Sequence, residues 1–422
     1  MTFPLISTRT CALSRPSVRT IRAGLERPVA SKVTRPPSPV ARTSPLLLLE
    51  MRRNASALKA GGIAFAGYMT AVPVLSALTD RVDSRRIYFG ACCLSALGAA
   101  GFALFAQGLW TALLFQFVIG AGLGGTYMPG MKTLTDPLQG SAQARATAFY
   151  AACFGVGSSL SIFASGWLAA NHSWQAAFVF GTVGPLIAAS LVMLLMPPGH
   201  TRKEKAATAL LDFRPVLANR VTRYYILGYA VHSYELFTQR AWMVAFIAFS
   251  ATLQPAGTAA AALSAATLAA IVNLCGPLMS VTGNELALRF GRERIIFVFM
   301  TASGLFTCGL GFAAGLPSAA VFVVMCVHYG LMLGDSAALT AGAIGSAHAD
   351  QRGAMLAVYS FIGFSAALVG PLVFGVVLDL AGGNRSTQAW VLAYVSIGIF
   401  GVFAPVARVL HKITKRKINE NN

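Results

Sequence analysis

The chain has 422 residues, of which 56% are hydrophobic and only 11% are charged, and its mean hydropathy is +0.65. A soluble protein carries roughly 25% charged residues because its surface must be hydrated, so this composition excludes a soluble multidomain protein. The formal net charge of +19 does not indicate a nucleic-acid partner, because ten of the 33 Lys and Arg residues lie in residues 1–56 and most of the others lie in short loops between apolar segments.

Residues 1–56 differ in kind from the rest of the chain. They contain nine Arg and one Lys but two acidic residues, are rich in Ser, Thr and Pro, and hold no apolar stretch long enough to span a bilayer. This composition resembles that of an organellar transit peptide, and it also fits an unstructured basic extension or an altered start of the coding sequence. We expect a basic, disordered N-terminal extension.

Eleven apolar segments follow at regular intervals. Each is as long as the ~18 apolar residues that mark a bilayer-spanning helix, and none shows the alternation of a membrane β-strand. Because lipid offers the backbone no hydrogen-bond partners, we expect every segment to be a helix in an all-α membrane protein. The predicted helices cover residues 57–78, 87–107, 109–131, 146–169, 174–197, 224–250, 258–282, 295–315, 317–340, 354–380 and 388–409.

Basic residues between these segments lie in every second loop, and Arg385 is the exception in the other series of loops. Cytoplasmic loops of membrane proteins carry an excess of Lys and Arg. We therefore predict that the charged series, including the basic tail 411–422, is cytoplasmic, and that the membrane is the cell (inner) membrane. The polar cytoplasmic linker 198–222 divides the helices into a predicted N-terminal bundle at 57–197 and a C-terminal bundle at 223–410.

Similarity between the two sides of this linker indicates an internal duplication. Arg81 and Arg86 recur as Arg289 and Arg294, and both pairs are separated by 208 residues. Transporter folds are often built from such repeats. Coincidence is the alternative in a chain that contains 41 glycines.

The loop after the first apolar segment reads Leu78-Thr79-Asp80-Arg81-Val82-Asp83-Ser84-Arg85-Arg86. It resembles the signature Gly-x-x-x-Asp-Arg-x-Gly-Arg-Arg that lies between the second and third helices of the major facilitator superfamily. Asp80 and Arg81 match this signature, whereas Ser76 replaces its first Gly. A degenerate copy in the second half keeps Arg-x-Gly-Arg as Arg289 to Arg292 but lacks the Asp.

The resemblance implies a fold of two helical bundles and secondary transport by alternating access through a cavity between them. It also implies twelve helices, with the signature loop after the second. Here one apolar segment precedes that loop, so we expect about eleven helices, with the first helix of the family missing or replaced by residues 1–56. An inactive, truncated transporter is therefore an alternative to an active one.

The charged residues of the signature loop and of its copy are predicted to form a cytoplasmic gate. A carboxylate there can pair with Arg or accept hydrogen bonds from the amides that begin a helix, and such contacts hold one conformation and break in the other. Asp80 and Arg81 are the leading candidates. The remaining basic residues of the predicted gate, for which fixing the topology is the alternative role, are Arg85, Arg86, Arg289 and Arg292.

Ionisable residues within the apolar segments are candidates for the transport pathway, because a charge in the membrane costs about 2.5–3.5 kcal/mol on insertion scales. In segment 224–250, His232, Glu235 and Gln239 share one helical face at i, i+3 and i+7, and Arg240 can reach that face with its long side chain. A buried carboxylate can carry a proton, so we expect Glu235 to couple proton movement to transport. Arg240 either holds an anionic substrate or only neutralises Glu235, and a structural Glu235–Arg240 ion pair is the alternative to proton coupling.

Other polar residues of the predicted helices are weaker candidates. His328, in the middle of segment 317–340, is either a ligand or a hydrogen-bonded packing residue. Asp335 lies nearer the cytoplasmic end and is a gate, a proton site or simply hydrated. Gln116 and Asn273 either line the cavity or join neighbouring helices.

The sequence thus predicts a proton-coupled secondary transporter of a small solute. We expect a monomer whose partners are the solute, the lipid bilayer and protons or another coupling ion. The chain contains no Walker-type phosphate loop, no strand–turn–helix that presents a nucleophile and no His/Glu spacing typical of a metal site, so we expect no enzyme activity, no cofactor and no metal. A membrane sensor that does not transport is the alternative function.

Overall fold

The computed structural model describes residues 63–198, 210–255 and 265–420, and its regular elements in these ranges are all helices. In chain order they are the helix Ile63–Leu78, α2 (Ser84–Phe105), α3 (Leu109–Gly124), α4 (Tyr127–Thr135), α5 (Gly140–Asn171), α6 (Trp174–Leu195), α7 (Arg214–Ala218), α8 (Arg220–Thr252), α9 (Ala265–Phe290), α10 (Arg292–Leu310), η1 (Gly311–Gly315), α11 (Ser318–Leu333), α12 (Ser336–Ser346), η2 (Ala349–Gln351), α13 (Arg352–Leu380) and α14 (Thr387–Glu420).

The described parts of the eleven predicted segments lie in helices, which confirms the all-α membrane fold, and residues 57–62 and 258–264 of these segments lie outside the described residues. Seven helical segments of this part of the chain are long and apolar enough to cross a membrane. Two predicted helices are interrupted: α3 ends at Gly124 before α4, and α11 ends at Leu333 before α12. Both interruptions include glycine, which weakens the helix because it lacks a side chain.

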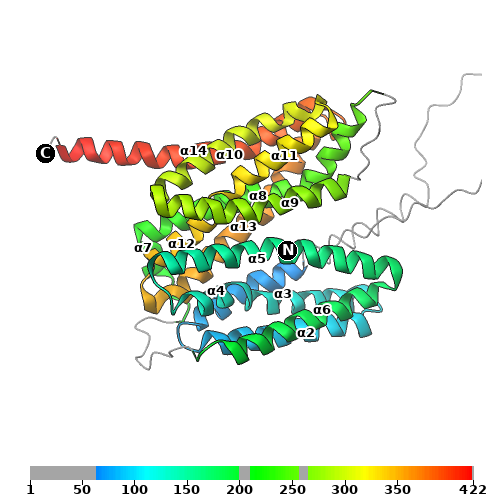
Figure 1. Cartoon of the computed structure of the whole chain (residues 1–422), viewed down its shortest axis with the longest axis vertical. Coiled ribbons are helices and arrows are strands. Elements are labelled where there is room, and N and C mark those ends of the chain that lie inside the picture. The colour runs from blue at the N-terminus through cyan, green and yellow to red at the C-terminus, as the bar shows by residue number, and fades with distance from the viewer. Residues whose placement is uncertain (1–62, 199–209, 256–264, 421–422) are drawn as a thin grey trace, which may run out of the picture.

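The helices form two bundles that lie side by side (Figure 1). In the first bundle, α2 packs against α3 and α6; in the second, α8 packs against α13 and α10 packs against α14. The predicted extension 1–56 lies outside the described residues, as do residues 199–209 of the predicted linker. The rest of that linker contains α7 and the first residues of α8, and α14 continues through the predicted tail as far as Glu420.

The bundles pack against each other on two sides. The helix Ile63–Leu78 packs against α13, where the Tyr68 hydroxyl lies 2.6 Å from Ser360 Oγ and the Tyr68 ring centroid lies 4.7 Å from that of Phe364. On the other side α5 packs against α9 and α12. In its described residues α5 buries side chains up to Ala148 and none beyond it. The bundles are therefore closely packed toward the end of the molecule at which α5 begins.

The interruption between α11 and α12 depends on a close approach of α9. A Cβ atom at Gly283 of α9 would lie within clash distance of the Gly334 carbonyl oxygen, so only glycine fits at this position. This approach seals the following residue, Asp335, inside the bundle, where 2% of its surface is exposed. Backbone packing therefore sets the position of a carboxylate that the next section describes.

Candidate transport site

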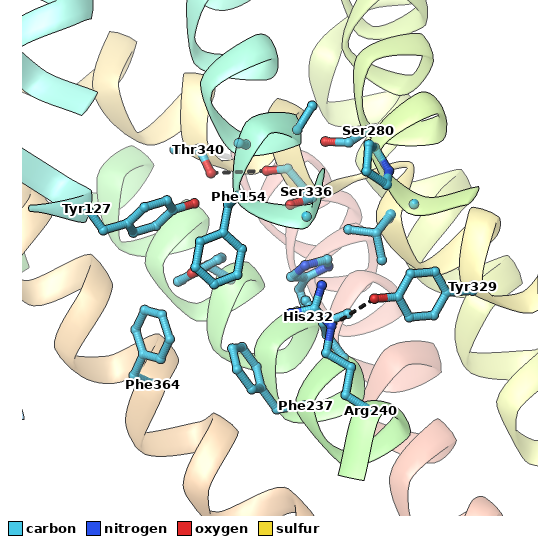
Figure 2. A pocket seen from close by; sticks show the side chains of 18 residues that line it. Tyr127, Phe154, His232, Phe237, Arg240, Ser280, Tyr329, Ser336, Thr340 and Phe364 are labelled. Carbon is cyan, nitrogen blue, oxygen red and sulfur yellow. Dashed lines mark hydrogen bonds between the residues drawn. The ribbon is translucent and has the colours of Figure 1, made fainter. Parts of the chain in front are cut away.

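A cavity lies between the two bundles, near the middle of α8 (Figure 2). It holds about 50 Å³ of space for the centre of a water-sized sphere and is partly open to its surroundings. The first bundle contributes side chains from α4 and α5, and the second contributes side chains from α8, α9, α11, α12 and α13. The polar and aromatic lining residues are Tyr127, Phe154, Tyr229, His232, Phe237, Arg240, Ser280, Tyr329, Ser336, Thr340 and Phe364.

Arg240 supplies a positive charge to the cavity wall. Its Nε donates a hydrogen bond of 2.8 Å to the Tyr329 hydroxyl, and its Cζ lies 5.9 Å and 5.7 Å from the ring centroids of Phe154 and Phe237. Figure 2 shows the side chain extending toward Tyr329. In the part of the chain that the structure describes, no carboxylate lies within ion-pair distance of Arg240, so the alternative of a Glu235–Arg240 ion pair is not observed.

His232 and Asp335 form a buried pair at the cavity wall. His232 Nδ1 lies 2.7 Å from Asp335 Oδ1, and each side chain is at most 3% exposed. The two atoms are at ion-pair distance, and neither these two atoms nor His232 Nε2 has another hydrogen-bond partner among the described residues. His232 lines the cavity, while Asp335 lies behind it at the start of α12. Asp335 is thus buried, so the alternative of a simply hydrated carboxylate is wrong.

Glu235 and His328 form a second buried pair, which is not among the residues that line the cavity. Glu235 Oε1 accepts hydrogen bonds of 2.5 Å from both Ser303 Oγ and Thr307 Oγ1, and it lies 3.5 Å from His328 Nε2. Thr307 Oγ1 also lies 2.6 Å from His328 Nε2. Since Thr307 has one hydroxyl proton and donates it to Glu235, His328 Nε2 must donate to Thr307. Oε1 of the carboxylate therefore has two hydroxyl donors, whereas His328 Nδ1 has no hydrogen-bond partner among the described residues.

The other predicted pathway residues do not line the cavity. Gln239 is buried, and its Nε2 lies 3.6 Å from the Met325 sulfur. Asn273 donates to the carbonyl of Ala269 in its own helix at 2.8 Å. Gln116 is buried on α3. The structure thus brings His232, Asp335 and Arg240 to the cavity region and places the remaining candidates in the packing between helices.

At the end of the molecule where α5 begins, Asp80 joins the bundles. Its two carboxylate oxygens accept hydrogen bonds from the backbone N–H groups of Gly353 (2.7 Å) and Ala354 (2.8 Å), in the first turn of α13. A negative charge at a helix N-terminus is stabilised by the free amides and by the helix dipole. Burial raises the pKa of Asp80 to about 6, although Lys132, whose Nζ lies 3.8 Å away, and the two amides act to lower it.

Two ion pairs and an apolar cluster accompany this contact. Arg352 Nη1 lies 3.3 Å from Asp136 Oδ1, and exposed Arg145 makes two hydrogen bonds of 2.8 and 2.9 Å with Glu285. None of these residues was predicted to belong to the gate, although Glu285 lies four residues before Arg289. The buried residues of the cluster include Met128 and Met131 of α4, Tyr225 and Ile226 of α8, and Met355 and Tyr359 of α13.

The predicted basic residues of the gate have different surroundings. Arg85 is buried within the first bundle, where it bonds Asp83 Oδ2 and donates to the Met196 carbonyl at 2.7 Å, so it fixes the start of α2 against the end of α6. Exposed Arg289 lies over the Phe290 ring at 5.2 Å. Arg81 and Arg86 are exposed and Arg292 is half-buried.

Sequence reasoning missed three residues that complete these sites. Ser303 and Thr307 are spaced i, i+4 on α10 and therefore face Glu235 together. Hydroxyl residues are common in apolar helices, and nothing in their spacing distinguishes this pair. Phe154 was also missed, because an aromatic residue in a lipid-spanning segment predicts packing alone.

Comparisons with known proteins agree with this architecture. A family model described as Major Facilitator Superfamily matches residues 45–371. The structure of the E. coli fucose:proton symporter FucP matches with a TM-score of 0.64 at 15% identity, covering 85% of this chain and 93% of that chain. The human organic anion transporter MFSD10 (TETRAN) gives a TM-score of 0.64 at 16% identity, over 84% and 85% of the two chains. At these identities the likeness shows a shared fold. No curated protein matches the sequence.

Proposed function

The chain belongs to the Major Facilitator Superfamily, and from this premise we propose that it is a proton-coupled carrier that moves a small solute through the cavity between its bundles by alternating access. Membership confirms the family resemblance predicted from the Asp80 loop. It indicates a secondary transporter embedded in a membrane, rather than an enzyme.

One observation carries the proposal: the cavity reaches residues of both bundles while their cytoplasmic ends are held together. The contact between Asp80 and α13, the Arg352–Asp136 and Arg145–Glu285 ion pairs and the cluster around Met131 all lie at that end. They support a conformation that is closed to the cytoplasm. A solute in the cavity would reach the cytoplasm once these contacts break and the bundles reorient.

The His232–Asp335 pair is the part of the site best suited to carry the proton. Histidine ordinarily titrates near neutral pH, and His232 lies at the cavity wall, where a proton can enter. The close distance to Asp335 links the charge states of the two groups. Glu235 was the sequence-based candidate for this role, but its hydrogen bonds with two hydroxyls and its place behind the cavity favour a structural role.

The remaining features of the proposal follow from the charge pattern. The basic loops place the linker and α7 on the cytoplasmic side, and we propose the cell (inner) membrane as the location. We also propose that the protein acts as a monomer, because the cavity lies between the two bundles of one chain. This carrier would use protons as its coupling ion.

The experiment is transport by purified protein in proteoliposomes that contain a pH-sensitive dye. A panel of radiolabelled small solutes would be offered with and without an imposed proton gradient. A proton-coupled carrier accumulates one of these solutes only with the gradient, and solute addition acidifies or alkalises the lumen. Uptake that is independent of the gradient would contradict proton coupling. Absence of uptake and of exchange for every solute that binds the protein would favour a non-transporting sensor.

A further inference from the structure

The guanidinium of Arg240 is a cation whose counter-charge is not supplied by the described protein. Two carboxylates are buried in the same bundle as Arg240, and each already contacts a histidine. Glu235 contacts His328, and Asp335 contacts His232. An unpaired charge within a membrane protein is costly and is usually retained for a function. The position of Arg240 in the cavity wall makes a ligand the natural source of the missing negative charge.

The hydrogen-bonding groups of Arg240 favour one kind of anion. Its Nε is used by the Tyr329 hydroxyl, which fixes the guanidinium plane. Nη1 and Nη2 have no acceptor among the described residues, and Arg240 is half-buried, so these atoms reach the cavity. Two parallel N–H groups on a planar fork match the two oxygens of a carboxylate.

The surroundings of this fork are aromatic. The Phe154 and Phe237 rings lie within 6 Å of the guanidinium carbon, and Tyr127, Tyr229 and Phe364 also line the cavity. Phe154 belongs to the first bundle and Arg240 to the second, so a ligand between them contacts both. An apolar, flat body would fill this space, because aromatic walls gain from burial and offset stacking.

We propose that the transported solute is a small organic carboxylate with an apolar or aromatic body, whose carboxylate is held by Arg240; this inference rests on the proposed transport function. A cationic solute would be repelled by Arg240. A neutral polyol would instead use hydroxyl groups such as Ser280, whose Oγ has no partner in the described part of the chain. Removing the guanidinium should therefore weaken the binding of a carboxylate solute but not that of a neutral polyol.

The test measures binding by thermal stability of the purified protein in detergent, with three acid–amide probe pairs: benzoate and benzamide, nicotinate and nicotinamide, and cinnamate and cinnamamide. We expect at least one acid to raise the unfolding temperature and its amide to have little effect. Arg240→Gln should weaken binding of that acid by about 10- to 100-fold, the loss expected for hydrogen bonds to a charged group. Arg240→Lys should restore part of the affinity, because it keeps the charge without the fork.

Arg223→Gln is the matched control, because Arg223 is an exposed arginine on the same helix, α8, outside the cavity. It should leave acid binding unchanged. The inference is overturned if no acid binds, if amides bind as well as acids, or if Arg240→Gln keeps the preference for the acid. Counterflow of the bound acid in proteoliposomes separates the two proposals. Binding without counterflow contradicts the carrier alone, whereas counterflow of a neutral solute without acid binding contradicts the anion alone.

Discussion

Two histidine–carboxylate pairs meet the middle of α8 and differ in how completely their polar atoms are bonded. Glu235, beside His328, accepts hydrogen bonds from both Ser303 and Thr307. In the second pair, His232 Nδ1 and Asp335 Oδ1 lie 2.7 Å apart, and His232 Nε2 has no hydrogen-bond partner among the described residues. The first pair is sealed in packing, whereas His232 borders the cavity.

This difference separates a structural pair from a functional one. A buried carboxylate that accepts hydrogen bonds from two hydroxyls resists protonation and movement, because either change would weaken those bonds or leave the hydroxyls unpaired. A buried pair that leaves polar atoms without hydrogen bonds lacks that restraint. The free-energy cost of those unbonded atoms is offset when a proton or a ligand binds to the pair. The two pairs share their residue types, so their surroundings decide their roles.

The largest expected effect comes from Asp335→Asn. This change removes the charge that His232 contacts but keeps the size of the side chain. If the pair carries the coupled proton, accumulation driven by a proton gradient should fall to the level of protein-free liposomes. Exchange of labelled for unlabelled solute should continue, because it needs no net proton movement. Measuring both in one preparation separates loss of coupling from loss of folding.

Gradient-driven accumulation that survives Asp335→Asn would place the proton elsewhere, and Glu235 would then return as the candidate. His232→Gln is a second arm of the same test. It removes the imidazole at the cavity wall and should also abolish accumulation while leaving exchange intact. If the two substitutions behave differently, the pair does not act as one unit.

A smaller effect on transport is expected for Glu235→Gln, together with a loss of stability. The amide of Gln lacks the negative charge that faces His328. One of its two terminal groups is an NH2 donor, and the Ser303 and Thr307 hydroxyls are also donors at this site. Leaving buried groups unpaired in this way should lower the free energy of unfolding by about 1–3 kcal/mol. Thermal unfolding in detergent measures this loss, and proton-driven accumulation per folded molecule should remain. Loss of accumulation at unchanged stability would reverse the assignment of the two pairs.

The fold was predictable from the sequence because long apolar segments and the charges of the loops between them identify membrane helices. The pairings around α8 were harder to predict, because they depend on how neighbouring helices rotate and where they break. Arg240 lies five residues after Glu235, about 140° around the helix, but about 80° from His232. Helical geometry alone therefore argued against a Glu235–Arg240 ion pair. The pair was still predicted as an alternative, because the long side chain of Arg240 can reach a neighbouring face of the helix.

Asp335 illustrates what sequence position cannot give. Its distance from the end of the apolar segment suggested a site near the cytoplasm, yet the break after Leu333 and the close contact of Gly283 with Gly334 hold it beside His232. By contrast, the contact that Asp80 makes was predictable from its motif, since the hydrogen bonds to Gly353 and Ala354 are those expected of a carboxylate at a helix end.

Asp80 is a titrating carboxylate outside the cavity. Its substitution should have a smaller effect on transport than substitutions in the two histidine–carboxylate pairs. Burial raises its pKa from 3.8 to about 6 in this closed conformation. The conformation that holds a proton more tightly is favoured at lower pH, and an Asp80 released to solvent would return toward its ordinary pKa. Lowering the pH from about 6 toward 3.8 should therefore shift molecules toward the closed cytoplasmic end. Distances between spin labels at exposed Gln139 and Arg214 would report the shift.

Asp80→Asn should flatten this pH dependence and leave proton-driven accumulation in place, whereas Asp335→Asn should do the opposite. Arg145→Gln is the control for the gate, because the Arg145–Glu285 pair also joins the bundles but is exposed to solvent. Exposed ion pairs contribute little and are screened by salt. Its effect on the label distances should be smaller than that of Asp80→Asn and should vanish at about 1 M salt, where the screening length is about 3 Å. An equal effect of the two substitutions would mean that charge at the cytoplasmic end, rather than burial of Asp80 against α13, holds the bundles closed.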